Sequence, residues 1–150
     1  MNATAAAEMR RIVQALRGTS RSASQNSETP RFLTLAGAGL ILVSGLIHLI
    51  LTPEHLKEAA YLGLLFLADF VGAVVAAFGI YRDRRWGWVL GALVAAGALV
   101  AYVISGTVGL PGMETEGLLN PVGVATKLVE ALFLGLFVLA LVNRDLPERP

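Results

Sequence analysis

Residues 32–51 read FLTLAGAGLILVSGLIHLIL, an apolar run without a single Asp, Glu, Lys or Arg. A helix of about 20 such residues is long enough to cross the hydrocarbon core of a lipid bilayer. Three further runs of mainly apolar residues follow it, over residues 53–81, 86–110 and 121–142. The chain is therefore predicted to be an all-α protein whose residues 31–143 form a bundle of four transmembrane helices.

The overall composition agrees with a membrane protein. Hydrophobic residues make up 55% of the 150 residues and charged residues only 15%, whereas soluble domains carry about 25% charged residues. The chain has no cysteine, which excludes disulfides and thiolate metal ligands. The net charge of +1 gives no reason to expect a nucleic-acid partner. The expected surroundings are lipid, with a second copy of the chain or a larger membrane complex as partner.

The arginines fall on alternate sides of the four apolar runs. Those before the first run, between the second and third, and after the last are Arg10, Arg11, Arg17, Arg21, Arg31, Arg82, Arg84, Arg85, Arg144 and Arg149. The other two connections carry mainly acidic residues, which are Glu54, Lys57, Glu58, Glu114 and Glu116. Connections rich in Lys and Arg stay in the cytoplasm. Both termini are therefore predicted to be cytoplasmic. The bias toward Arg, Ala, Gly, Val and Leu indicates a high-GC bacterial genome, so the expected location is the inner (plasma) membrane of a bacterium.

The two ends of the chain are predicted to form tails. Residues 1–30 are polar and contain no secretory signal. Within them, residues 3–18 suit an amphipathic helix lying on the anionic inner leaflet, with an unstructured tail as the alternative. Residues 19–30 are rich in serine and are predicted to be a linker. Residues 144–150 form a short C-terminal tail.

The second helix is predicted to begin at Pro53. Residues 52–54 read Thr-Pro-Glu, which suits an N-cap, the first helical position and an acidic first turn. This start would place His55 and Glu58 on the same helix as Asp69, with His55 and Asp69 on one face.

Two further patterns concern packing. Trp86 and Trp88 suit an aromatic belt at the cytoplasmic membrane surface. Gly87, Gly91 and Ala95 recur every four residues. This spacing of small residues favours close approach of helices, within one bundle or between two copies.

Four ionisable side chains are predicted to lie at bilayer depth. A charged side chain at the bilayer centre costs roughly 2.5–3.5 kcal/mol on insertion scales, so these groups need partners or a purpose. Asp69, Lys127 and Glu130 are predicted to form one intramembrane polar network. Such carboxyl groups could share protons, or the network could only fix the register of the helices. The fourth group, His48, taken alone suits a hydrogen bond to the Ser44 carbonyl.

A more specific prediction is that a metal ion is bound near the connection between the first two spans. His48, His55 and Glu58, with Glu54 beside them, lie near the connection between the first two spans. Imidazole and carboxylate ligands suit a divalent transition metal such as Zn²⁺, Cu²⁺ or Fe²⁺. A haem between the two histidines is disfavoured, because both lie near one loop and leave little room for the macrocycle.

The chain resembles a group of small, uncharacterised four-helix membrane proteins of actinobacterial type, distantly DoxX-like in architecture. The resemblance covers roughly residues 32–142. The residues that carry it are His48, Pro53, Glu54, His55, Glu58, Gly63, Thr107, Gly109, Pro111 and Glu130. Where many members carry Thr-Arg-Thr before the Gly-x-Pro segment, this chain has Ser-Gly-Thr at 105–107. The resemblance implies the four-helix membrane fold and no particular activity.

Two functional classes follow from the sequence. The first is a membrane protein with a polar pocket facing outward, which binds a metal ion or relays protons for a membrane partner. The alternative is a non-catalytic structural subunit or assembly factor whose polar groups only hold the bundle together. No phosphate-binding loop, nucleophile–base pair or dinucleotide fingerprint occurs in the sequence, so an enzyme is the less expected reading.

Overall fold

A computed structural model of the chain describes residues 8–14, 30–111, 115 and 119–145. Its four long helices are α2 (Arg31–Glu58), α3 (Ala60–Tyr81), α4 (Arg85–Thr107) and α5 (Pro121–Asp145). All four are long and apolar enough to cross a membrane, and no strand occurs in the described ranges. The chain is therefore a multi-pass, all-helical membrane protein, as predicted.

Only part of the predicted tails falls within the described residues. Residues 8–14 are helical and exposed, inside the range predicted for an amphipathic helix. Residues 1–7 and 15–29, which hold the rest of that range and most of the predicted linker, lie outside the described residues, as do residues 146–150.

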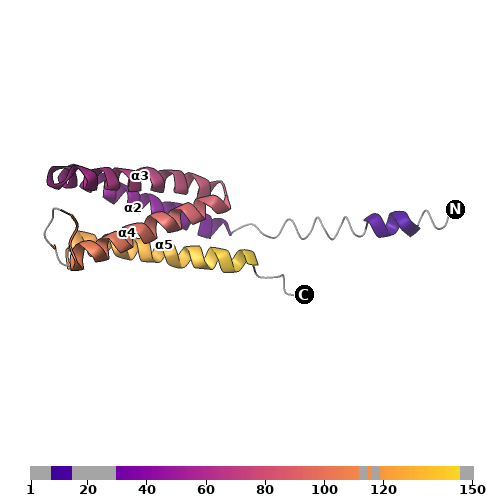
Figure 1. Cartoon of the computed structure of the whole chain (residues 1–150). Coiled ribbons are helices and arrows are strands. Elements are labelled where there is room, and N and C mark those ends of the chain that lie inside the picture. Colours follow the sequence, from indigo (N-terminus) through magenta and orange to yellow (C-terminus); the bar gives the residue numbers. More distant parts are fainter. Residues whose placement is uncertain (1–7, 15–29, 112–114, 116–118, 146–150) are drawn as a thin grey trace.

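Each of the four helices runs antiparallel to the one before it in sequence, as Figure 1 shows. Ala59 alone separates α2 from α3, and three residues separate α3 from α4, so each pair must be antiparallel. α2 contacts α3 most extensively and also lies against α5, while α4 lies between α3 and α5. The helices thus form a ring in which α2 and α4 face each other with few contacts.

This topology gathers the described arginines of the bundle at one end, which we call the arginine end. It holds the start of α2 with Arg31 and the turn with Arg82, Arg84 and Arg85, beside the end of α5 (Figure 1). The opposite end, called the loop end, holds Ala59 and the connection from α4 to α5. Among the described residues, the fold therefore places the arginines of the bundle at the end opposite to Glu54 and Glu58 in the last turns of α2.

The predicted start of the second helix at Pro53 is wrong. α2 continues through Pro53 to Glu58 and ends where Ala59 adopts extended backbone, with φ −155° and ψ 131°. Side chains bond to the backbone around the proline: Thr52 Oγ1 donates to the His48 carbonyl oxygen at 2.8 Å. Proline lacks an N–H and disfavours a helix interior, but here tertiary packing overrides that cost. A Cβ at Gly63 would overlap Leu56, so the absence of a side chain at Gly63 allows the last turn of α2 to pack closely against α3.

Glycines bring α3 and α4 into backbone contact. A Cβ at Gly87 would overlap the backbone of Gly79, and one at Gly91 would overlap the Phe133 ring. By contrast, a Cβ at Gly97 would meet nothing within 4 Å. The predicted close packing of small residues on this helix is thus confirmed for Gly87 and Gly91, within one chain.

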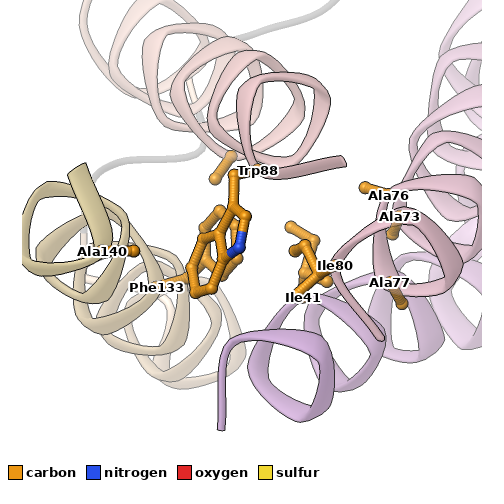
Figure 2. Close-up of a cluster of buried hydrophobic side chains, with 9 residues drawn as sticks. Ile41, Ala73, Ala76, Ala77, Ile80, Trp88, Phe133 and Ala140 are labelled. Carbon is orange, nitrogen blue, oxygen red and sulfur yellow. The ribbon is translucent and has the colours of Figure 1, made fainter. Parts of the chain in front are cut away.

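An apolar core fills the half of the bundle nearest the arginine end. Figure 2 shows this core, whose buried members are Ile41, Ala73, Ala76, Ala77, Ile80, Trp88, Ala95, Phe133 and Ala140. The Trp88 ring stacks on Phe133, with ring centroids 6.0 Å apart and an angle of 16° between planes. It also lies so close to Gly37 that a Cβ there would overlap the ring.

This packing corrects the prediction for one tryptophan. Trp88 is only 2% exposed and belongs to the core, whereas Trp86 is 49% exposed. Two positions apart on a helix, the two rings point in very different directions. Only the exposed Trp86 is therefore available for an interfacial belt.

Candidate functional site

Polar side chains from three helices meet in the half of the bundle nearest the loop end. They are Ser44 and His48 on α2, Asp69 on α3, and Lys127 and Glu130 on α5, and we call them the polar cluster. Residues 44 and 48 share a face of α2 one turn apart, as residues 127 and 130 do on α5. Helical spacing in the sequence thus suffices to explain why each pair turns the same way.

Glu130 lies at the centre of the polar cluster and is completely buried. Its Oε2 accepts a hydrogen bond from Lys127 Nζ at 2.6 Å, and its Oε1 accepts one from Ser44 Oγ at 3.2 Å. The ammonium group of Lys127 also lies 5.5 Å from the centre of the Tyr102 ring. Both carboxylate oxygens of Glu130 are therefore satisfied, one of them by a charge-assisted bond.

His48 lies between the two carboxyl groups of the polar cluster. Its Nδ1 is 2.9 Å from the Ser44 carbonyl oxygen, so the hydrogen bond expected from the sequence is confirmed. A carbonyl oxygen only accepts, so Nδ1 must carry the proton and donate it. When the imidazole is neutral, Nε2 therefore holds a free lone pair, 3.8 Å from Glu130 Oε1.

Asp69 is the one carboxyl group of the cluster with an unsatisfied oxygen. Its Oδ2 is buried and has no hydrogen-bond partner among the described residues. It lies 3.3 Å from His48 Nδ1, whose proton is directed toward the Ser44 carbonyl. Leaving a buried acceptor unsatisfied is costly, and more so when it is charged. Asp69 Oδ2 is therefore close to the imidazole of His48 but receives no hydrogen bond from it.

The charges of the polar cluster do not balance when His48 is neutral. With both carboxyl groups ionised, Asp69 and Glu130 carry two negative charges against the single ammonium group of Lys127. One negative charge therefore remains in a part of the chain that is expected to lie in lipid, where an uncompensated charge is expensive. One additional proton makes the cluster neutral.

A second histidine lies closer to the loop end. The ring of His55 stacks on Phe66, with centroids 3.9 Å apart and an angle of 21° between planes. Phe66 also contacts His48, at 5.1 Å between centroids. His55 Nε2 lies 4.0 Å from Glu58 Oε2. The Phe66 ring therefore contacts both imidazoles of the chain.

The four residues predicted to bind a metal are not assembled as a ligand set. His48 and His55 lie seven residues apart on the uninterrupted α2, roughly 10 Å along the axis at 1.5 Å per residue. Glu54 is exposed. Within the described ranges, no group of three or more His, Cys, Asp or Glu could hold a metal ion. The expectation depended on two antiparallel helices meeting at Pro53, and that boundary is wrong.

The residues of the predicted intramembrane network do lie close together in the structure. Lys127 and Glu130 form a direct ion pair, while Asp69 joins them through His48. From the sequence, His48 is predicted as a metal ligand and Phe66 has no predicted role. The signal for Phe66 was its position three residues before Asp69, which places both on one face of α3.

Comparison with known proteins gives no further identification, because no family model, no curated protein and no solved structure matches this chain. The polar cluster is therefore interpreted from its own chemistry.

Proposed function

We propose that this protein binds and releases one proton at the polar cluster and serves as a proton-relay subunit for a partner in the bacterial plasma membrane. The observation that carries the proposal is that two carboxyl groups and a single lysine are gathered around a histidine. Histidine is the side chain whose protonation ordinarily changes between about pH 5 and 8.

The proton binds at Nε2 of His48. Before uptake, Nδ1 donates to the Ser44 carbonyl and Nε2 is a free acceptor. After uptake, the imidazolium has Asp69 Oδ2 at 3.3 Å from Nδ1 and Glu130 Oε1 at 3.8 Å from Nε2. The added charge thus has a carboxylate beside each ring nitrogen, and the cluster becomes neutral. On release the proton leaves from the same nitrogen.

The apolar core limits where the proton can go. Ile41, Ile80, Trp88 and Phe133 fill the half of the bundle between the polar cluster and the arginine end, and each is at most 2% exposed. Water and polar side chains carry protons through a protein, and a close-packed apolar layer provides neither. The cluster therefore exchanges protons with the loop-end side or with a partner beside it, and the bundle alone is no channel.

A structural role is the second candidate, and the short Lys127–Glu130 ion pair favours it. Buried polar pairs can fix the register of helices without any change in protonation. In that case His48 would keep one protonation state throughout the range in which the protein stays folded.

Nitrogen NMR of the imidazole rings separates the two candidates. The sequence contains two histidines, so a ¹⁵N-histidine sample in lipid gives only two sets of signals, and His55→Gln assigns them. We expect the His48 signals to change from the Nδ1–H form to the imidazolium form as the pH falls from about 8 to 5. A His48 spectrum that stays in one form while the protein remains folded would support the structural role and refute the relay.

The orientation of the relay follows from the charges of the connections. The arginine end lies in the cytoplasm and the loop end outside, because cationic connections are retained in the cytoplasm. A reporter fused after Pro150 is therefore expected to read cytoplasmic, as is one fused before Met1. A tag inserted at Thr115 is expected to be labelled by an impermeant reagent added to intact cells. Labelling of a C-terminal tag from outside would reverse the assigned orientation.

A further inference from the structure

His55 and Glu58 form a second pair of titratable groups, outside the polar cluster. His55 Nδ1 donates to the Leu51 carbonyl oxygen at 3.0 Å, so its Nε2 is the free acceptor and faces Glu58 at 4.0 Å. The side chains of His55 and Glu58 are 18% and 34% exposed, against 9% for His48. This pair is therefore the more accessible of the two histidine sites.

The Phe66 ring lies against both histidine sites. The imidazoles are attached two helical turns apart on α2, and Phe66 of α3 contacts both rings. A phenyl ring neither accepts nor donates a proton. A proton on His55 therefore cannot pass to His48 through hydrogen bonds while the ring stays in place.

We propose that His55 and Glu58 form a proton-loading site on the loop-end side and that Phe66 is the barrier which separates it from the polar cluster. The proposal rests on the proposed relay, since it supplies that relay with its route of uptake. A proton is accepted by Nε2 of His55, with Glu58 as counter-ion, and reaches Nε2 of His48 when the Phe66 ring moves aside. The protonated His55 ring is also held by its stacking on Phe66, since a cation is attracted to an aromatic face.

Pro53 weakens the backbone of α2 between the two histidines. Pro53 lies between the two histidines and contributes no N–H to the helix, so the last turn is joined to the rest of α2 by fewer hydrogen bonds. α2 then ends at the extended residue Ala59. The segment that carries His55 and Glu58 thus has a weakened connection on one side and a chain reversal on the other.

The barrier predicts how the two histidines react with diethyl pyrocarbonate, which modifies neutral imidazole. In the intact protein in lipid nanodiscs, mass spectrometry should show His55 modified at least about tenfold faster than His48. A tenfold ratio of rates corresponds to a difference of only about 1.4 kcal/mol in the free-energy barrier to modification. Phe66→Ala should raise the rate at His48 to near that of His55. The matched control is Phe78→Ala, which removes a 56% exposed ring from the other end of α3 and should leave both rates unchanged.

Phe66→Val keeps the proposal testable if the alanine variant does not fold, because a partial opening should give an intermediate rate at His48. Equal rates at both histidines in the unmodified protein would overturn the barrier. So would a folded Phe66→Ala or Phe66→Val variant in which His48 stays fully protected. At about pH 8, above the range in which histidine ordinarily titrates, the rate reports access to the neutral rings. It therefore distinguishes failure of the barrier from failure of the relay, which the NMR titration of His48 reports separately.

Discussion

Replacing Lys127 by Met is expected to lower the free energy of unfolding by about 3–5 kcal/mol, the usual cost of removing one partner of a buried ion pair. The substitution nearly conserves volume but removes the ammonium group that lies 2.6 Å from Glu130 Oε2. Glu130 is completely buried, so its carboxylate cannot turn to water for compensation. The cluster would then contain two carboxylates and no cation. Unfolding in mixed detergent micelles, followed by circular dichroism, measures the loss.

The chain offers a matched control for this substitution. Lys57 is the only other lysine and is exposed near the end of α2, so Lys57→Met should change the unfolding free energy by less than about 0.5 kcal/mol. Adding Glu130→Gln to Lys127→Met should recover part of the loss, because it removes the stranded carboxylate. Strictly additive effects in this double-mutant cycle would show that the two residues do not interact.

The four membrane helices were predictable because hydropathy acts over about 20 residues at a time. What a long apolar run does not specify is the position of a chain reversal within a few residues. Residues 52–54 match the local sequence pattern of a helix start, yet no helix starts there and α2 continues to Glu58. The contact of Leu56 with Gly63, made only in the folded bundle, outweighs that local preference.

The same reasoning explains the tryptophans. Trp86 and Trp88 have equal hydropathy and lie equally near the arginines, so the sequence treats them alike. They differ in their neighbours in the fold: only Trp88 packs over Gly37, which has no side chain, and stacks on the Phe133 ring. Both come from helices distant in sequence, and pairing of that kind depends on how each helix rotates about its axis.

The candidate site was predictable to the extent that it follows from spacing along single helices. The pairing of Lys127 with Glu130 depends on an interval of three residues and was predicted correctly. The placement of His48 beside Asp69 depends on how α2 and α3 face each other. The metal-site prediction required the chain to turn at Pro53, so one misplaced boundary was enough to misassign both histidines.

Counting the protons taken up by the purified protein tests the central claim most directly. The protein is placed in lipid nanodiscs in the His55→Gln background, so that the accessible histidine does not contribute. The sample is titrated from about pH 8 to pH 5, the range in which histidine ordinarily titrates, and compared with the same protein carrying Asp69→Asn. The second substitution retains His48 but removes one carboxylate from the cluster. Glu130 and Lys127 then balance each other before any proton is bound.

We predict that the His55→Gln protein takes up about one more proton over this range than the variant that also carries Asp69→Asn, because the substitution removes the charge imbalance that drives proton uptake by the cluster. Equal proton uptake by the two proteins would contradict the account. It would mean either that His48 titrates independently of its neighbours or that the cluster exchanges no proton at all.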